Sequence, residues 1–311
     1  MTNYQTKSPV LFLIFNRPDT TLQVFNQIRL AKPKRLYIAA DGARKNQLND
    51  AVLCEKAREI STKIDWECDL KTLFRKENLG CKNAVSSAID WFFEQEEEGI
   101  ILEDDCLPSS SFFSFCDQML ERYRADSRIR HITGSNLQLG QAWGEASYYF
   151  SRITAVWGWA SWRRVWKEYD KDLLQYNETE VQHQLNNIFS DTFLEYQWMK
   201  VFKALKANEI NTWDYQLALI NYFNNGLSVT PNVNLISNIG FRADATHTPD
   251  SGFVYSQLPL EEIGEMVHPQ YYLPETEADN FIFNKEFRLD EIKKKHFSLR
   301  RRFKRWLKSL F

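Results

Sequence analysis

The sequence predicts an α/β protein built on a mostly parallel sheet with helices on both faces. Two observations lead to this prediction. Short, continuous apolar runs alternate with helical segments through the first 135 residues, and the connections between them are short. Polar clusters follow several of the runs, and ligands of such sheets bind at the edge where the strands end.

The first strand is expected at residues 10–15, because an apolar run of this length is typical of a strand buried on both faces. Pro18 cannot lie inside a central strand, and the polar residues after it favour a helix that ends near Leu30. The same reasoning predicts strands at 35–40, 69–74, 99–102, 130–133 and 227–230, and helices at 49–63, 80–97, 109–124, 191–207 and 214–223.

Composition narrows the class of protein. With 43% apolar and 26% charged residues, the 311-residue chain is expected to fold rather than to be disordered. The five cysteines are odd in number and lack metal-type spacing, so we expect reduced thiols and a cytoplasmic protein. No signal-like segment and no membrane-spanning run occurs in the sequence.

Three consecutive acidic residues, Glu103, Asp104 and Asp105, follow the run at 99–102. A strand end that holds adjacent carboxylates can place one on a hard divalent cation, Mn²⁺ or Mg²⁺, while diphosphate and water fill the remaining positions. The alternative is a solvated acidic turn with no ligand.

The order of several motifs resembles the GT-A (Rossmann-like) glycosyltransferases, in particular N-acetylglucosaminyltransferase I and the bacterial nucleotide-diphospho-sugar transferases of the hemolytic-protein-like type. The matching segments are Phe15-Asn16-Arg17, Ala40-Asp41-Gly42, Asn78-Leu79-Gly80, Glu103-Asp104-Asp105, Phe112-Phe113, Trp157-Gly158-Trp159, Trp213-Asp214 and the stretch from Pro231 to Gly240. The resemblance covers about the first 250 residues and implies a UDP-sugar donor with Mn²⁺ or Mg²⁺.

The resemblance also implies roles for five residues at the donor side. Asp41 would bind the nucleotide base and Arg17 the diphosphate. Glu103 would bind the donor sugar, Asp104 the ribose and Asp105 the metal. Taken singly, Arg17 could equally form a surface salt bridge, and Asp41 could simply form the turn before Gly42.

Asp214 is the candidate catalytic base, because transfer to a hydroxyl needs a group that removes the acceptor proton. The alternative is a helix N-cap, since Thr212-Trp213-Asp214 precedes an apolar helical segment. His247 is a second candidate metal ligand, as many GT-A enzymes bring a C-terminal histidine to the metal; the alternative is an ordinary surface or core histidine.

Trp157 and Trp159 are expected to form an acceptor-side wall, with Gly158 allowing close approach of the backbone. The alternative is an aromatic core. For Trp162 and Trp166, spaced as i and i+4 on a helix, we favour the core.

The C-terminal segment differs in charge from the rest of the chain. Nine Lys and Arg residues and no acid fall between residues 293 and 311; subtracting these nine from the net charge of −2 leaves −11 elsewhere. Leu299, Phe303, Trp306, Leu307 and Leu310 fall on one helical stripe. Such a stripe favours an anionic membrane surface over nucleic acid as the partner.

Taken together, the sequence predicts an inverting glycosyltransferase that moves a sugar from a UDP-sugar to a hydroxyl of a glycan or lipid-linked glycan, in cell-surface polysaccharide synthesis at the inner face of the membrane. The expected parts are a GT-A domain over 1–250 (a nucleotide-sugar-binding half over 1–135 and an acceptor-side half over 136–250), an irregular extension over 251–292 and a membrane-associating tail over 293–311.

Two rival functions remain. A sugar-nucleotidyltransferase shares this style of fold, but its glycine-rich loop after the first strand is replaced here by Asn16-Arg17-Pro18-Asp19. A non-catalytic, membrane-associated scaffold with a degenerate cleft is the other rival.

Overall fold

The computed structural model describes residues 4–241 and 254–298. Contacts between residues group the chain into two compact units, one formed by 1–171 and 211–275 and the other by 172–210 and 276–311. Each unit is described by itself.

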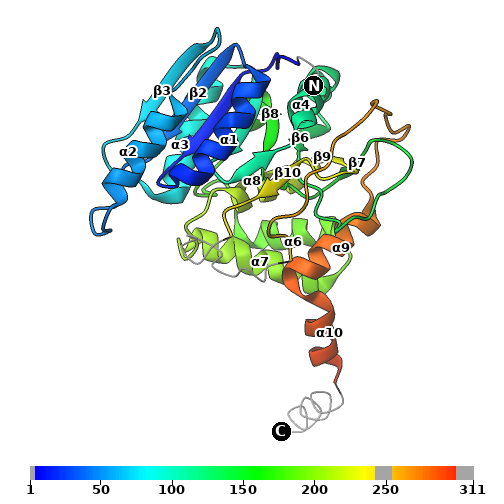
Figure 1. Cartoon of the computed structure of the whole chain (residues 1–311). Helices are drawn as coiled ribbons and strands as arrows, with labels where there is room; N and C mark the ends of the chain where they lie inside the picture. The colour runs from blue at the N-terminus through cyan, green and yellow to red at the C-terminus, as the bar shows by residue number, and fades with distance from the viewer. Residues whose placement is uncertain (1–3, 242–253, 299–311) are drawn as a thin grey trace. The chain divides into compact units, whose positions relative to one another are not determined.

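The first unit contains an eight-stranded mixed sheet with the strand order β3-β2-β1-β4-β8-β6-β9-β7 (Figure 1). Its strands are β1 (Val10–Ile14), β2 (Arg35–Ala40), β3 (Asp69–Phe74), β4 (Glu98–Glu103), β6 (Ile129–Thr133), β7 (Tyr148–Ser151), β8 (Trp159–Trp162) and β9 (Leu227–Pro231). β3, β2, β1 and β4 are all parallel, as are β6 and β9, whereas β8 and β7 run antiparallel to their neighbours. The predicted α/β class with a mostly parallel sheet is confirmed.

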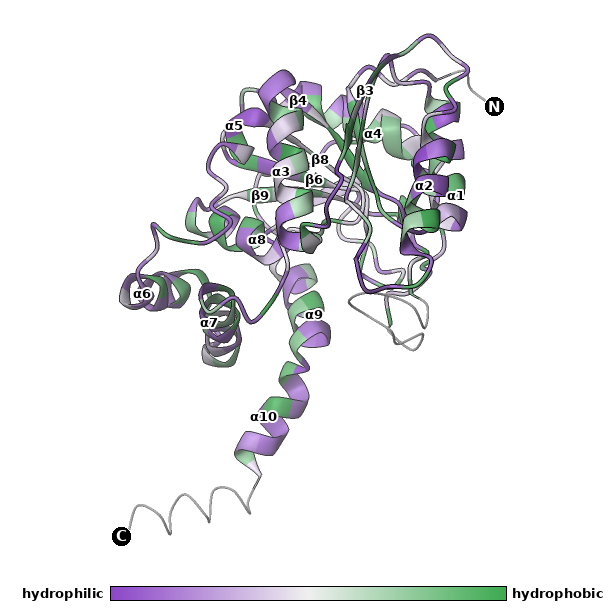
Figure 2. Cartoon of the chain, turned by 90° about the vertical axis from the view of Figure 1, so that its left-hand side faces the viewer, coloured by the Kyte–Doolittle hydropathy of each residue, from purple (hydrophilic) through white to green (hydrophobic). Residues whose placement is uncertain are grey.

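Helices cover both faces of this sheet because successive strand residues point to opposite sides. The helices of this unit are α1 (Pro18–Ala31), α2 (Asp50–Ser61), α3 (Gly80–Gln95), α4 (Ser110–Tyr123), α5 (Arg163–Trp166) and α8 (Asp214–Phe223). Phe12 and Ile14 share a core with α1, α2 and α4, whereas Leu11 and Leu13 share a core with α3 and α8. The strands are largely hydrophobic in Figure 2, and α1 and α2 alternate in hydropathy along their length.

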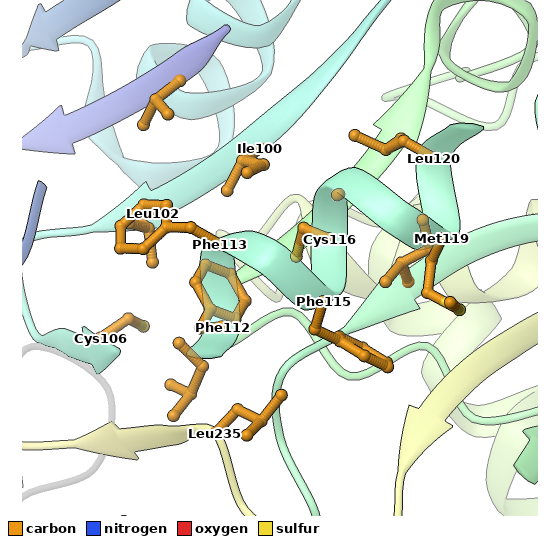
Figure 3. Packing of buried hydrophobic residues seen from close by; sticks show 14 of the residues in the cluster. Ile100, Leu102, Cys106, Phe112, Phe113, Phe115, Cys116, Met119, Leu120 and Leu235 are labelled. Carbon is orange, nitrogen blue, oxygen red and sulfur yellow. The ribbon is translucent and has the colours of Figure 1, made fainter. Parts of the chain in front are cut away.

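Helix α4 anchors the segment that follows the acidic triplet. Its residues Phe112, Phe113, Phe115 and Cys116 are buried, and their side chains pack with Leu102 of β4 in one cluster (Figure 3). This packing fixes the end of β4, and therefore the carboxylates that come directly after it.

The aromatic-rich segment forms part of the sheet instead of a separate wall. Residues Trp159–Trp162 make β8, which pairs antiparallel with both β4 and β6. The expected helical spacing of Trp162 and Trp166 is therefore wrong, since Trp162 lies on β8 and Trp166 on α5. Both are buried, at 2% and 5% exposure, so the favoured core assignment is confirmed.

The two edge strands of the sheet, β7 and β3, differ in what lies beside them. At β7, the amide of Ser147 donates to the carbonyl of Val267 (2.8 Å) and the amide of Glu275 to that of Phe150 (2.7 Å), and Pro274 bridges to Phe150. At the other edge β3 carries Asp69 and Lys71. A second, two-stranded sheet pairs β5 (Cys106–Pro108) with β10 (Ile236–Asn238) in antiparallel register.

The second unit is helical. It contains α6 (Glu178–Ile188), α7 (Thr192–Lys206), α9 (Thr276–Phe287) and α10 (Leu289–Phe297). Asn177 caps α6 by accepting from the amide of Thr179 (2.8 Å), and Asp191 caps α7 by accepting from that of Phe193 (2.9 Å). Within residues 4–241 and 254–298, no helix is both long and apolar enough to span a bilayer.

Candidate functional site

The candidate residues gather where parallel strands end. β1 pairs with β2 on one side and with β4 on the other, all in the same direction, so their carboxyl ends meet at one edge. Arg17 follows β1, Asp41 follows β2 directly, and the acidic triplet begins at the last residue of β4. The sequence-based expectation that these three groups share an edge is consistent with this topology.

Arg17 is the cationic partner of the triplet. It occupies the cap position before α1, which begins with Pro18, and its guanidinium forms a short ion pair with Asp105. Asp104 lies 3.8 Å from the same Nη1 and accepts from the amide of Phe15 (2.9 Å). Burial lowers the pKa of Arg17, but Asp104 and Asp105 outweigh it and raise that pKa overall. Arg17 therefore links the ends of β1 and β4.

Glu103 and Asp214 bring two further carboxyl groups close to this ion pair. Burial raises the pKa of Glu103, and Asp105, Asp104 and Asp214 raise it further. Burial and the charge of Asp105 likewise raise the pKa of Asp104. Neither Glu103 nor Asp214 has an ion-pair partner among the described residues. The carboxyl groups of the triplet and Asp214 outnumber the guanidinium of Arg17 beside them. This imbalance favours binding of protons or of a further cation.

Asp214 is the first residue of α8, and Trp213 holds the cap position. The hydroxyl of Thr212 donates a short hydrogen bond to the Asp214 carboxylate. The cap alternative therefore finds no support, while the role of Asp214 as a base stays a prediction.

The backbone closes tightly around Asp105. The amide of Ile239 donates to the Asp105 carbonyl (2.8 Å), and a Cβ on Gly240 would lie 2.1 Å from Asp105 Oδ2. No side chain fits at residue 240 without moving this carboxylate. Gly240 is therefore a site residue, although the sequence predicted no role for it beyond membership of a matching segment.

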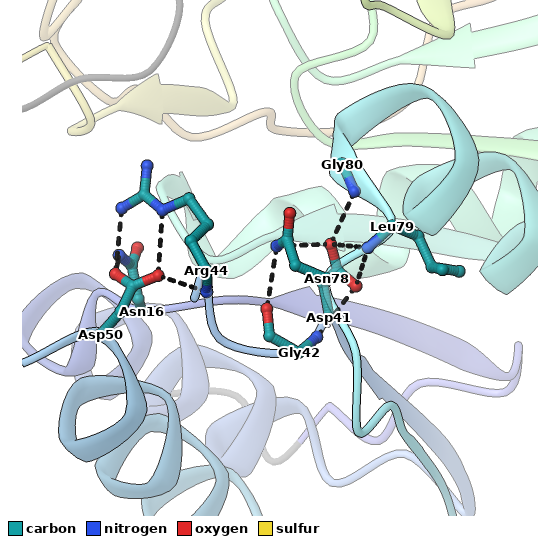
Figure 4. Close-up of polar contacts among 8 residues, drawn as sticks. All are labelled: Asn16, Asp41, Gly42, Arg44, Asp50, Asn78, Leu79 and Gly80. Atoms are coloured by element: carbon teal, nitrogen blue, oxygen red, sulfur yellow. Dashed lines mark hydrogen bonds and ion pairs between the residues drawn. The ribbon is translucent and has the colours of Figure 1, made fainter. Parts of the chain in front are cut away.

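Asp41 organises the loop before α3. Its carboxylate accepts from the amides of Gly42 (2.9 Å), Leu79 (2.9 and 3.1 Å) and Gly80 (3.1 Å) and from the side chain of Asn78 (2.9 Å), as Figure 4 shows. A carboxylate offers about four positions for accepting hydrogen bonds, so these bonds fill the acceptor positions of Asp41. The predicted contact of Asp41 with a nucleotide base would need one of these bonds to break.

A second network lies beside Asp41 and was missed from the sequence. Asp50 is 2% exposed and accepts from Arg44 through its amide (2.9 Å), Nε (2.9 Å) and Nη2 (3.0 Å), and from Asn16 (2.5 Å), also drawn in Figure 4. The hydrogen bonds from Arg44 lower the pKa of Asp50 to about 2. Next to this network, an open hollow of about 370 Å³ is lined by Arg44, Lys45, Asn46, Gln47, Glu77 and Asn78.

The two tryptophans of the expected acceptor wall differ. Trp157 is partly buried and meets the ring of Phe241 edge-on at 5.5 Å. Trp159 is 1% exposed and stacks with His131 and Trp213, so its ring is part of the core and offers no free surface to a sugar. The acceptor role of Trp157 stays a prediction.

A divalent cation fits the chemistry of the triplet, although no three His, Cys, Asp or Glu side chains converge as its ligands within the described residues. Hard cations prefer carboxylate oxygens, and Mg²⁺ needs only one or two when diphosphate and water complete its shell. The excess of carboxylates over cations provides the matching charge. His247, the other predicted ligand, lies outside the described residues, as does the apolar stripe of the tail.

The sequence matches no protein-family model and no curated protein. Among solved structures, the chain is similar to UDP-glucose pyrophosphorylase complexed with UDP-glucose (9% identity, TM-score 0.40) and to the apo form of UDP-glucose pyrophosphorylase (11%, TM-score 0.37), each over 74% of this chain and 93% of the other. It is also similar to a cytidylyltransferase from Leptospira borgpetersenii serovar Hardjo-bovis (9%, TM-score 0.32), over 54% of this chain and 64% of the other.

Proposed function

We propose that the chain is a transferase that acts on nucleotide sugars. The observation that carries this proposal is the arrangement at the end of β4, where Arg17 joins Asp104 and Asp105 while the carboxyl groups of Glu103 and Asp214 lie close by. A guanidinium matches the oxygens of a diphosphate, and carboxylates match sugar hydroxyls and a divalent cation. In sheets of this kind, such a ligand binds at the carboxyl ends of the parallel strands.

Within this class, we propose glycosyl transfer from a UDP-sugar to a glycan or lipid-linked glycan hydroxyl. Asp214 would accept the proton of the acceptor hydroxyl as the oxygen attacks the anomeric carbon in line, with inversion. Arg17 would stabilise the charge that develops on the departing diphosphate. Glu103 would hold the donor sugar and Asp104 the ribose, and Trp157 would contact the acceptor.

The hollow beside Asn78 is the proposed place for the nucleotide base. Its lining combines amide, cationic and acidic side chains, which can supply both donors and acceptors to a base edge. Asp41 would then position the loop before α3 and would not itself accept a hydrogen bond from the base.

Asp105 would hold Mn²⁺ or Mg²⁺, with His247 as the second proposed ligand. When bound, a divalent cation supplies a Lewis acid that neutralises charge on diphosphate oxygens.

Nucleotidyl transfer is the second candidate, in which a sugar phosphate attacks a nucleoside triphosphate and pyrophosphate leaves. The position of Arg17 favours it, because an arginine in the loop after the first strand can hold a triphosphate. The attacking phosphate is already ionised, so this reaction would leave Asp214 without a task as a base.

One experiment separates the candidates. The protein is incubated with UDP-sugars and glycan acceptors, and in parallel with UTP and sugar 1-phosphates, while release of UDP and of pyrophosphate is measured. Release of UDP dependent on an acceptor supports glycosyl transfer; release of pyrophosphate supports nucleotidyl transfer. Calorimetry with UDP, GDP and dTDP, with and without Mn²⁺, accompanies it. Absence of binding and of both products would reject the transferase and favour the scaffold.

We also propose that the C-terminal segment from residue 293 binds an anionic membrane surface, supported by its nine cations and its apolar sequence stripe. A chain ending at Ser298 should lose binding to vesicles containing phosphatidylglycerol and keep its nucleotide affinity. Binding of the full chain to DNA at the same salt concentration, with none to vesicles, would contradict this proposal.

A further inference from the structure

Arg17 and Asp105 form the closest charged contact of the candidate site, and both are partly shielded from solvent, with side chains 21% and 16% exposed. The ion pair involves Oδ2 of Asp105, the oxygen against which the backbone of Gly240 also packs. The other oxygen, Oδ1, faces the thiol of Cys106 at 3.6 Å. The carboxylate proposed to hold a divalent cation is therefore already occupied by a guanidinium.

A guanidinium and a divalent cation cannot both lie on this carboxylate without strong repulsion, because like charges a few ångströms apart in a partly buried site are poorly screened. The tight backbone at Gly240 leaves Asp105 little room to turn away. The side chain of Arg17, by contrast, is long, and its exposed part gives it a path to move.

Arg17 also has a second destination. The proposed nucleotide-sugar ligand brings a diphosphate to the same edge, and a guanidinium binds phosphate oxygens with two parallel hydrogen bonds. An arginine released from Asp105 would lose one anion and gain another, so the exchange avoids leaving a buried charge without a partner.

We propose that Arg17 is an exchangeable partner of Asp105, holding this carboxylate in the free protein and passing to the diphosphate when a divalent cation takes its place. The inference rests on the proposed function for the identity of the diphosphate. It makes cation and nucleotide bind cooperatively, since each favours the state in which Arg17 has left Asp105. Cation alone must compete with Arg17 and binds weakly.

Two opposite changes test the exchange in one variant, Arg17→Gln. Without nucleotide, calorimetry should show Mn²⁺ binding the variant about tenfold more tightly than the unmodified protein, because Asp105 is no longer occupied. With Mn²⁺ present, UDP should bind the variant at least about tenfold more weakly. The rise in melting temperature on adding Mn²⁺ alone should also be larger in the variant.

Arg29→Gln is the matched control, because it removes the same charge from the other end of α1, where Arg29 pairs with Asp65 on the surface. It should leave both affinities unchanged. Arg17→Lys keeps a charge near Asp105 and should fall between the two proteins; it also serves if Arg17→Gln folds poorly, which circular dichroism reports.

Equal or weaker Mn²⁺ binding by Arg17→Gln and Arg17→Lys, relative to the unmodified protein, overturns the exchange. So does UDP binding to the unmodified protein that is independent of Mn²⁺. If no nucleotide binds under any condition, the proposed function fails, whereas the comparison of Mn²⁺ alone still tests whether Arg17 competes with the cation at Asp105.

Discussion

Two charged clusters at the carboxyl ends of the strands use the same residue types, but the pKa values of their carboxyl groups shift in opposite directions. Around Asp50, donors from Arg44 and Asn16 surround a single buried carboxylate and lower its pKa to about 2. Around Asp105, three carboxyl groups lie near Arg17, Asp214 adds a fourth beside Glu103, and the pKa of Glu103 rises instead. The first cluster is complete by itself, whereas the second has room for charge from a ligand.

Structural and functional acids can be told apart by how far the protein itself fills their hydrogen-bonding and charge requirements. A carboxylate whose acceptor capacity is filled by the protein stabilises the fold. A group of carboxylates that outnumbers its cations is costly for the fold alone and is better explained by a ligand.

The largest effect is expected for Asp214→Asn. Asparagine keeps the size of the side chain and its bond with Thr212 but cannot accept a proton, so turnover should fall by about 10²- to 10⁴-fold. UDP affinity and stability should change little. Single-turnover assays with acceptor measure this loss, and Asp65→Asn on the surface is the control. Full turnover in Asp214→Asn would remove this residue from the chemistry.

For Asp50→Asn, we expect a loss of stability of about 2 kcal/mol, since the pKa of Asp50 lies almost two units below its ordinary value and one unit corresponds to about 1.4 kcal/mol. The measurement is urea unfolding at pH 7. Asp69→Asn, on the edge strand β3, is the control and should change stability by less than about 0.5 kcal/mol. A neutral Asp50→Asn would show that the complete cluster adds nothing to the fold.

The pH dependence of the unfolding free energy should reflect the lowered pKa of Asp50. Because the folded-state pKa of Asp50 is depressed to about 2, its contribution is present above the unfolded-state value near 4 and is lost as pH falls toward 2. Urea unfolding from pH 5 to pH 2 should therefore show a smaller loss in Asp50→Asn than in the unmodified protein. Parallel curves for the two proteins would contradict the assignment.

The smallest effect is expected for Asp41→Asn, which replaces one acceptor oxygen by an amide that faces the N–H groups of Leu79 or Gly80. We expect a loss of about 1 kcal/mol in unfolding free energy, together with faster hydrogen exchange at these two amides. If the variant keeps its stability but loses UDP affinity, Asp41 acts on the base directly, as the family resemblance implied.

The alternating first half of the fold could be predicted because its signals are local. β2 and β3 have the predicted bounds, and α1 begins at Pro18, where a proline fits the first turn. β8 could not be predicted, since Trp159–Trp162 is not a distinct apolar run and its strand conformation comes from pairing with β4 and β6.

The candidate site was predicted as a set of residues at one edge, and the geometry of that set depends on distant segments. Asp41 binds amides that lie 38 and 39 positions later in the chain, and Asp105 lies against Gly240. No local pattern indicates such pairings. A salt bridge of Arg17 was one alternative from the sequence, but its partner, Asp105, could not be predicted for the same reason.

The two edge strands of the sheet disfavour self-association in different ways. At β7, Pro274 and the chain around it take up backbone groups that another molecule would otherwise use, and proline has no N–H to offer a further strand. At β3, Asp69 and Lys71 place opposite charges on the open edge, which disfavours stacking of identical strands in register. Neutralising Asp69 and Lys71 together should therefore make the protein more prone to aggregate.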